Sequence, residues 1–351
     1  MWIILTGNIY CLVRDSNNVD AKTRFVDRMR FYFKNKYDDY IGKRIFVVSY
    51  NGELDKNKLE KIETKGVTHF INSLALVKHF GNTDEFFKVN VETVDLISDF
   101  CIEHNIELVH ISTLSVSGDI VENAKKLEQF KIEKKDYTEK CFYVGQELDN
   151  VYALTKFLAE RVILEKMANG TLNARILRMG NLSDRYSDGK FQINDKDNAF
   201  SQRLKSLIAM GVLPEEIKSQ KIDFTPVDIA AKSVNSILKS TNENIIYHLY
   251  DSNKVCIETV VKKINSMGVK LEFGDSTQIS ETIKSSIDNG NQELLRGIMV
   301  DISEGNKLKY ITDVNVTNEI TNNVLNSLGF KWPEIDDRYL EQFIGRLIKK
   351  G

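Results

Sequence analysis

The sequence predicts an α/β protein built around a doubly wound parallel sheet. Short apolar runs rich in β-branched and aromatic residues begin near positions 8, 44, 67, 108, 174 and 245. Most of them are separated by segments with helical periodicity, which is the pattern of parallel βα units. At 351 residues the chain exceeds one ordinary core, so we also expect a second, smaller domain.

The first half of the chain supplies this sheet in regular alternation. We expect strands at 8–13, 44–50, 67–72 and 108–112, and helices at 19–36, 55–64 and 84–104. A strong helix that opens at Tyr152, a strand at 174–179, a helix at 227–238 and a strand at 245–250 complete the pattern. In such sheets ligands bind beyond the carboxyl ends of the strands, where Arg14, Asn72 and Thr113 are expected.

The remaining residues predict a smaller, mainly helical domain that covers the substrate. Residues 183–200 are polar and irregular, a helix follows at 199–210, and the chain from residue 257 is helical with interruptions. It ends in an amphipathic helix at 337–348. We therefore expect a nucleotide-binding domain at 1–181, to which 224–255 returns, and a substrate domain made of 182–223 and 256–351.

The overall composition argues against several classes of function. A net charge of −2 gives no whole-chain attraction to nucleic acid or to an anionic membrane. The apolar opening Met1–Leu5 is too short for a signal peptide or a membrane span. The cysteines are scattered, without CxxC or histidine at metal-ligand spacing, so we expect a reduced cytoplasmic protein without a metal site. They are Cys11, Cys101, Cys141 and Cys256.

A hydroxyl, a phenol and an amine stand in the order that a carbonyl reductase needs. Thr113 lies in a hydroxyl cluster at the end of the fourth strand, Tyr152 opens the next helix, and Lys156 follows one turn later. Hydride addition puts negative charge on a carbonyl oxygen, which must be held and protonated. Tyr152 would donate the proton, Thr113 a second hydrogen bond, and the Lys156 ammonium would lower the pKa of the phenol.

Spacing alone does not select Tyr152. A tyrosine precedes a lysine by four positions at Tyr32, Tyr152, Tyr186 and Tyr250. Only Tyr152 opens a strong helix directly after the crossover from the fourth strand. Taken singly, a surface tyrosine, a solvated lysine and a capping threonine are the commoner interpretations. The three residues in this order favour catalysis.

Several stretches together resemble the thioester reductase domains that terminate nonribosomal peptide synthetases. These domains belong to the extended short-chain dehydrogenase/reductase superfamily, with carboxylic acid reductases and fatty acyl-CoA reductases. The resemblance implies a Rossmann-like fold and NADPH-dependent release of an acyl or peptidyl thioester as an aldehyde, sometimes reduced on to the alcohol. The thioester would arrive on a phosphopantetheinylated carrier protein. The stretches are Asn8–Asp15 with Arg24, Asn72–Gly81, His110–Gly118, Tyr152–Glu160, Arg178–Asn181 and Asp223–Asp228.

The resemblance also implies roles for single residues. Thr113, Tyr152 and Lys156 match the catalytic residues of the family, and Lys156 also holds the nicotinamide ribose. Arg14 and Arg24 match the positions that bind the 2′-phosphate of NADP, which suits guanidinium groups. For Arg24, an ordinary charge on a helix surface is an equal alternative. Asn72 matches an asparagine close to the cofactor, although an asparagine at a strand end often only forms a turn.

One family motif is missing from this sequence. Related domains open with a strand and a TGxTGxxG turn, whose amides bind the pyrophosphate at a helix N-terminus. Here no two glycines lie closer than six positions. We therefore expect a sheet without its first strand and glycine-rich turn, as if truncated at the N-terminus, and weakened NADPH binding.

Two other functions stay open. A nucleotide-sugar epimerase or dehydratase of the same superfamily uses the same threonine, tyrosine and lysine, although the CLVR strand and the PVD segment argue against it. A catalytically silent module that only docks a carrier protein is the alternative from a different class.

Overall fold

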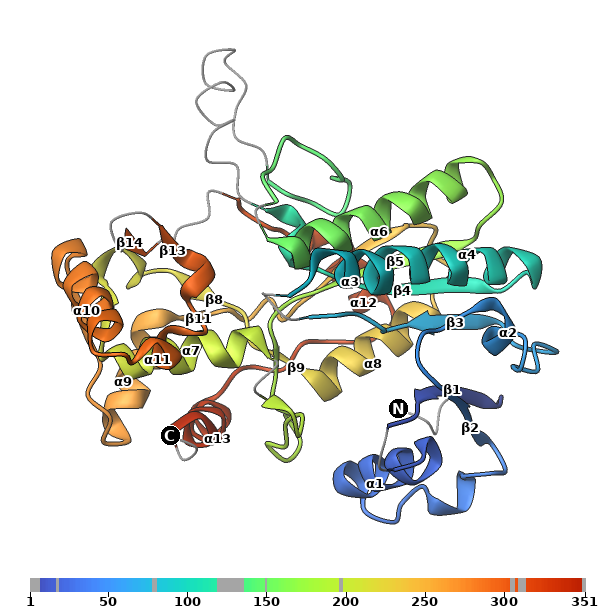
Figure 1. The fold of residues 1–351 in the computed structure, drawn as a ribbon, viewed down its shortest axis with the longest axis horizontal. Coiled ribbons are helices and arrows are strands. Elements are labelled where there is room, and N and C mark those ends of the chain that lie inside the picture. The colour runs from blue at the N-terminus through green and yellow to red at the C-terminus, as the bar shows by residue number, and fades with distance from the viewer. Residues whose placement is uncertain are drawn as a thin grey trace. The chain divides into compact units, whose positions relative to one another are not determined.

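The computed structural model describes residues 7–16, 19–77, 81–118, 136–148, 150–195, 198–303, 307–308 and 314–348 (Figure 1). The apolar opening Met1–Leu5 lies outside these residues. Contacts divide the chain into a first unit, made of Met1–Leu74, Phe87–His110 and Leu158–Arg175, and a second unit with the remaining residues. The expected domain boundary near residue 181 stays a prediction.

The first unit begins with two parallel strands and a helix. β1 (Ile9–Arg14) pairs with β2 (Ile45–Tyr50) in a register that sets Arg14 opposite Tyr50. α1 (Ala21–Phe33) packs against both strands. The helix begins where the side chain of Asp20 accepts a hydrogen bond from the amide of Thr23 at 2.9 Å. A 3₁₀ turn (Asp38–Tyr40) and the short α2 (Lys56–Leu59) complete this part.

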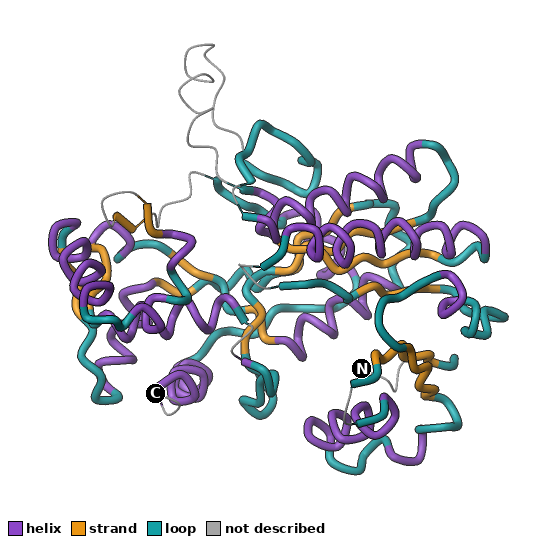
Figure 2. The backbone as a smooth tube through the Cα atoms, in the orientation of Figure 1, coloured by secondary structure: helices purple, strands orange, loops and turns teal. Residues whose placement is uncertain are grey.

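The main sheet has four strands in the order β10-β5-β4-β3. Figure 2 draws all strands in orange. β3 (His69–Asn72) pairs in parallel with β4 (Glu107–Thr113), and β5 (Ala174–Met179) pairs in parallel with β10 (Ile246–Leu249). β10 is buried throughout and β5 at all but one residue. Strands buried on both faces explain the continuous apolar runs in the sequence. The predicted α/β parallel fold is confirmed.

The predicted strands form two sheets in the described part of the chain, and not one. The Ile9 amide donates to Arg44 and the Asp15 amide to Tyr50, so the backbone groups of Tyr10 and Leu12 point to the other side of β1. By the same alternation, the backbone groups of Ile71 face away from β4. No described strand pairs with either side. β1 is only half-buried, and Ile71 is 41% exposed.

The long predicted helix at 84–104 is interrupted. It consists of α3 (Thr83–Phe87), a π-helical turn (Lys88–Glu92) and α4 (Thr93–Glu103). Asn90 is fully buried within the π turn. The helix that Tyr152 was expected to open is α6 (Val151–Ala168). Among the residues that the structure describes, no helix combines the length and the apolar character needed to cross a membrane.

The second unit contains most of the later helices and several short strand pairs. Phe224, Val261, Ile264, Leu340 and Phe343 belong to one of its apolar cores. The helices are α7 (Ala199–Met210), α8 (Val227–Leu238), α9 (Ile257–Ser266), α10 (Ser276–Asp288), α11 (Gln292–Leu295), α12 (Glu319–Ser327) and α13 (Asp337–Ile348), with 3₁₀ turns at Leu114–Ser117, Glu215–Ile217 and Met299–Asp301. The paired strands are β6 (Leu182–Ser183) with β9 (Thr225–Pro226), β7 (Val212–Pro214) with β12 (Glu272–Gly274), β8 (Lys221–Ile222) with β11 (Val255–Cys256), and β13 (Ile302–Ser303) with β14 (Lys307–Leu308).

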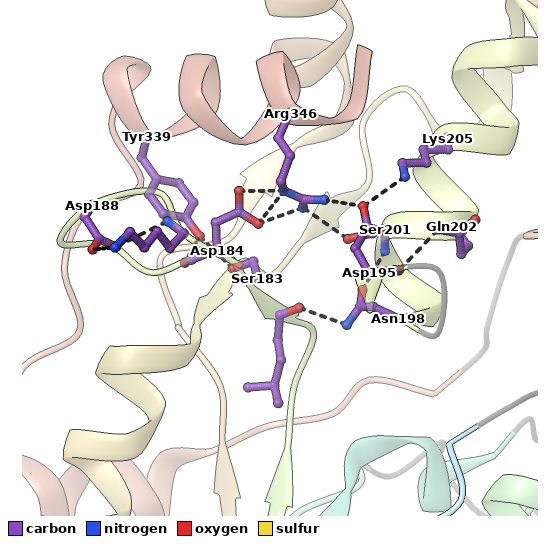
Figure 3. A network of polar contacts seen from close by, with 12 residues as sticks. Ser183, Asp184, Asp188, Asp195, Asn198, Ser201, Gln202, Lys205, Tyr339 and Arg346 are labelled. Carbon is purple, nitrogen blue, oxygen red and sulfur yellow. Dashed lines mark hydrogen bonds and ion pairs between the residues drawn. The ribbon is translucent and has the colours of Figure 1, made fainter. Parts of the chain in front are cut away.

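A buried ionic network attaches α13 to the segment after β6 (Figure 3). The Arg346 Nε atom donates to both carboxylate oxygens of Asp184, at 2.9 and 2.8 Å. Arg346 also contacts Asp195 at 3.5 Å, and Lys205 contacts the same Asp195 oxygen at 3.2 Å. The hydroxyl of Tyr339 donates to the Asp184 carbonyl at 2.7 Å. Because the Asp184 side chain is only 1% exposed, its charge depends on Arg346.

We expect Arg346→Met to lower the free energy of unfolding by about 3–5 kcal/mol, because it leaves the Asp184 carboxylate buried without its cation. Urea unfolding followed by circular dichroism measures this. The control is Arg338→Met on the same helix, whose side chain is 66% exposed and should matter by less than about 1 kcal/mol. Equal losses in the two variants would contradict this role for Arg346.

Candidate functional site

The structure brings Thr113, Tyr152 and Lys156 together in the second unit. Thr113 is the last residue of β4, and Tyr152 lies in the first turn of α6. The Thr113 side chain lies close enough to the Tyr152 hydroxyl to lower the pKa of the phenol. One helical turn later, the Lys156 Nζ atom donates to the Ile111 carbonyl of β4 at 2.7 Å. All three side chains therefore meet at the carboxyl end of one strand.

The Lys156 side chain is buried and therefore needs polar partners. Lys156 is 1% exposed, and a charge in the protein interior is costly without polar partners. The Ile111 carbonyl supplies one such partner and fixes the direction of the side chain. The ammonium is thereby held at the strand end where Thr113 lies.

Burial also acts on Tyr152. It raises the pKa of the Tyr152 phenol, and the Thr113 side chain lowers this pKa only in part. The net direction is opposite to the lowering that we expected from Lys156 alone. In this structure the phenol keeps its proton at neutral pH, which is the form that an acid needs.

A short turn orders the Thr113 side chain. The 3₁₀ turn Leu114–Ser117 follows β4 directly, and the Thr113 Oγ1 atom accepts a hydrogen bond from the Ser115 amide at 3.2 Å. The same oxygen donates to the Ser115 hydroxyl at 3.1 Å. The orientation of Thr113 therefore depends on where this turn is held.

Arg14 and Arg24 lie together in the first unit. An Nη1 hydrogen of Arg24 is donated to the Arg14 carbonyl at the end of β1. Arg14 is exposed, and it lines a cavity of about 290 Å³. The Arg14 guanidinium beside this cavity is of the kind that binds a phosphate, and Arg24 contacts the backbone of Arg14.

The cavity beside Arg14 combines apolar and charged walls. Leu54, Leu74 and Leu96 supply apolar surface, and Glu53 is ion-paired with Lys88 at 2.7 Å. An apolar pocket with a few polar groups is the usual form of a small-molecule site. The sequence alone does not predict this cavity, because its walls come from four separate segments that only the fold brings together. The carboxyl end of β2, beyond Tyr50, was the one signal that could have identified it.

Asn72 behaves as a turn-forming residue in this structure. Its Oδ1 atom accepts a hydrogen bond from the Leu74 amide at 3.1 Å, and its Nδ2 atom contacts His110 Nδ1 at 3.3 Å. The residue is 3% exposed. Its contacts therefore fit the alternative of a strand-end turn, and a contact with the cofactor stays a prediction.

Two carboxyl groups lie near the carboxyl ends of β5 and β10: Asp223, two residues before β9, and the buried Asp251, two residues after β10. Asp223 accepts hydrogen bonds from the Asn181 amide and side chain at 2.7 and 2.8 Å. Asp251 is fully buried, and its Oδ2 atom has no hydrogen-bond partner among the described residues. Burial raises the pKa of both groups, that of Asp251 to about 6, and the charge of Asp223 contributes to this rise. Among the described residues no cluster of histidine, cysteine, aspartate and glutamate could hold a metal ion.

The comparisons with known proteins agree with this fold. A family model for an NAD-binding domain, described as male sterility protein, matches residues 4–234. A thiolation-reductase di-domain from an archaeal non-ribosomal peptide synthetase is 32% identical and superimposes with a TM-score of 0.84. That match covers 98% of this chain and 70% of the other. No curated protein sequence gives a significant match.

More distant structures share the fold alone. The reductase domain of the aureusimine biosynthetic cluster is 22% identical with a TM-score of 0.79, covering 98% of this chain and 84% of that one. A dTDP-glucose 4,6-dehydratase from Bacillus anthracis, in complex with NAD, is 13% identical with a TM-score of 0.57. That alignment covers 98% of this chain and 97% of the dehydratase.

The raised pKa of Asp251 predicts a pH dependence of stability. A carboxyl whose pKa rises from 3.8 to about 6 on folding stabilises the fold below pH 3.8, and this contribution is lost as the pH rises through 6. Between pH 4 and pH 7.5 the titration of Asp251 should lower the free energy of unfolding of the parent by up to about 3 kcal/mol. We expect Asp251→Asn to abolish this decrease. Urea unfolding at both pH values, for parent and variant, measures the difference. An unchanged pH dependence would contradict the assignment.

Proposed function

Because the chain belongs to the male sterility family of NAD-binding domains, within the extended short-chain dehydrogenase/reductase superfamily, we propose that it reduces a carrier-bound acyl or peptidyl thioester with NADPH. The family makes the protein an oxidoreductase of the nicotinamide-dependent kind. The thioester substrate, the aldehyde product and the preference for NADPH are our proposal. Further reduction to the alcohol is compatible with it.

One observation carries the proposal: the Thr113 side chain acts on the Tyr152 hydroxyl, and Lys156 is bonded to the carbonyl of Ile111, two residues before Thr113 on β4. These are the three side chains that carbonyl reduction needs. Two hydroxyl groups at one point can hold an oxygen on which negative charge develops, once the Thr113 hydrogen turns from the Ser115 hydroxyl to that oxygen. The raised pKa of Tyr152 keeps a proton available for that oxygen.

The proposed reaction balances with one hydride and one proton. NADPH, when bound, supplies the hydride to the thioester carbon. Thr113 and Tyr152 hold the carbonyl oxygen, and Tyr152 passes its proton to that oxygen as the tetrahedral hemithioacetal forms. The carbon–sulfur bond then breaks, the thiol leaves with a proton, and the aldehyde remains. Lys156 stabilises the phenolate that is left on Tyr152.

Each unit carries groups of the kind that NADPH needs. Arg14 and Arg24 would hold the 2′-phosphate, and the adjoining cavity would accept the adenine ring. Lys156 would hold the nicotinamide ribose, and Asn72 would lie near the cofactor. No glycine-rich turn in this sequence suits the pyrophosphate. We propose that the sheet lacks its first strand, because no strand among the described residues pairs with one side of β1 or with one side of β3.

A phosphopantetheinylated carrier protein is the proposed partner. The similar archaeal structure joins a reductase to a thiolation domain, and this favours a tethered substrate here. The cytoplasmic location stays a prediction.

Two alternatives keep some support. The dehydratase with the same fold favours a nucleotide-sugar substrate, which NADPH consumption with an acyl thioester would exclude. A silent docking module is favoured by the absent glycine-rich turn, and it predicts no turnover at all.

The first test is Tyr152→Phe. We expect NADPH oxidation with an acyl-phosphopantetheine thioester to fall by about 10²–10⁴-fold, because the proton donor is lost. Absorbance at 340 nm and aldehyde trapping measure the reaction. The control Tyr186→Phe removes a hydroxyl from another tyrosine that precedes a lysine by four positions, and it should keep the parent rate. Equal rates in Tyr152→Phe and parent would exclude the mechanism.

The second test concerns the 2′-phosphate. We expect Arg14→Met to weaken NADPH binding by about 10–100-fold and to leave NADH binding unchanged, because a charge-assisted hydrogen bond is lost. Titration with nicotinamide fluorescence measures both. We also expect the parent to bind NADPH weakly, with a Kd above the micromolar range, because its sequence lacks the pyrophosphate-binding turn. Tight NADPH binding by the parent would refute the expectation that the missing turn weakens binding. An equal loss of NADH binding in Arg14→Met would refute the role of Arg14.

A further inference from the structure

The segment from Cys141 to Glu147 contacts both elements that carry the catalytic residues. It contacts the 3₁₀ turn Leu114–Ser117, which directly follows β4, and it contacts Phe157 of α6. All of these residues belong to the second unit. The segment is therefore placed to influence how Thr113 and Tyr152 meet.

Gln146 makes the contact with the turn. It is 4% exposed, and its Nε2 atom donates to the Val116 carbonyl at 3.1 Å and to the Phe142 carbonyl at 2.9 Å. Its Oε1 atom accepts from the Val144 amide at 2.7 Å. Both hydrogens of the amide are used, so the side chain has one orientation and bridges the segment to the turn. A buried amide satisfied in this way is a rigid link.

Two further contacts fix the geometry around this link. The Phe142 ring stacks on Phe157, the residue after Lys156, with centroids 4.3 Å apart and planes 8° from parallel. Gly118, at the end of the turn, has a φ of +52°, and a Cβ atom there would lie 2.1 Å from the Glu147 carbonyl. The segment thus packs closely against both α6 and the turn. The turn therefore cannot move without disturbing the segment.

The beginning of the segment is held independently. The Arg178 Nη1 atom donates to the Cys141 carbonyl at 2.9 Å, and the Tyr137 hydroxyl donates to the Phe142 carbonyl at 2.9 Å. A change at Gln146 therefore leaves this end attached. Its effect should be confined to the turn that follows Thr113.

We propose that Gln146 is a positioning residue that holds the turn after β4, and with it the Thr113 hydroxyl, in the place where Tyr152 can share a substrate oxygen. This inference rests on the proposed function for its catalytic consequence. Gln146 itself touches neither Thr113 nor Tyr152 in any hydrogen bond described here. It acts through the Val116 carbonyl and the Thr113–Ser115 bonds.

The test is Gln146→Glu, which keeps the shape and replaces two N–H donors by a carboxylate that faces two carbonyls. We expect kcat to fall by about 10–100-fold, as displacement of a catalytic group predicts, with the KM for NADPH unchanged. The defect should shrink as the pH falls, because a protonated glutamic acid again has a donor for one carbonyl. Gln146→Met, which has no donor and no charge, should show the same loss at every pH.

Hydrogen–deuterium exchange separates this inference from the proposed function. We expect the amides of residues 114–117 to exchange at least about tenfold faster in both variants, because the anchor of the turn is lost. The matched control Gln192→Glu removes a comparable donor to the Asn194 carbonyl and should change neither exchange nor kcat. A parent without turnover would refute the proposed function alone. Unchanged exchange at 114–117, or full kcat in both Gln146 variants of an active parent, would overturn the inference.

Discussion

The hydrogen bond from the buried Lys156 ammonium to the Ile111 carbonyl is the constraint on which the candidate site depends. An interior cation must find polar partners, and here one partner is the backbone of β4 itself. That bond ties the first turns of α6 to the end of β4. With that bond in place, Tyr152 one turn earlier reaches Thr113, and the turn held by Gln146 completes the arrangement.

The unexpected direction of the Tyr152 pKa fits this arrangement. Burial favours the neutral phenol, and the Thr113 side chain offsets it only partly. A reductase needs its phenol as a proton donor, so a raised pKa in the free protein is no obstacle to the reaction. The lysine matters after the proton has left, when the phenolate must be stabilised close to a positive charge.

Several elements could be predicted to the residue because their end signals are local. α7 begins after Asn198, whose side chain accepts from the Ser201 amide, and it ends at Gly211 with positive φ. The grouping of Thr113, Tyr152 and Lys156 was also expected, since strand order and helix spacing determine it. The division into two sheets, the π turn around Asn90 and the two-residue strands leave no periodic pattern in the sequence. The cavity beside Arg14 and the bridge made by Gln146 depend on residues distant in the chain, and so does the burial of Asp251.

In the described part of the chain, one side of β1 and one side of β3 have no paired strand, and open edges of this kind affect how proteins behave in concentrated solution. Tyr10, Leu12 and Ile71 set apolar side chains beside backbone groups for which no described strand supplies a partner. Natural proteins shield such edges with lysine, proline or a bulge, and the sequence of β1, IYCLVR, has a charge only at its last position. Edges of this kind template the addition of strands from other molecules, so self-association and aggregation are the expected hazards of handling this chain at high concentration.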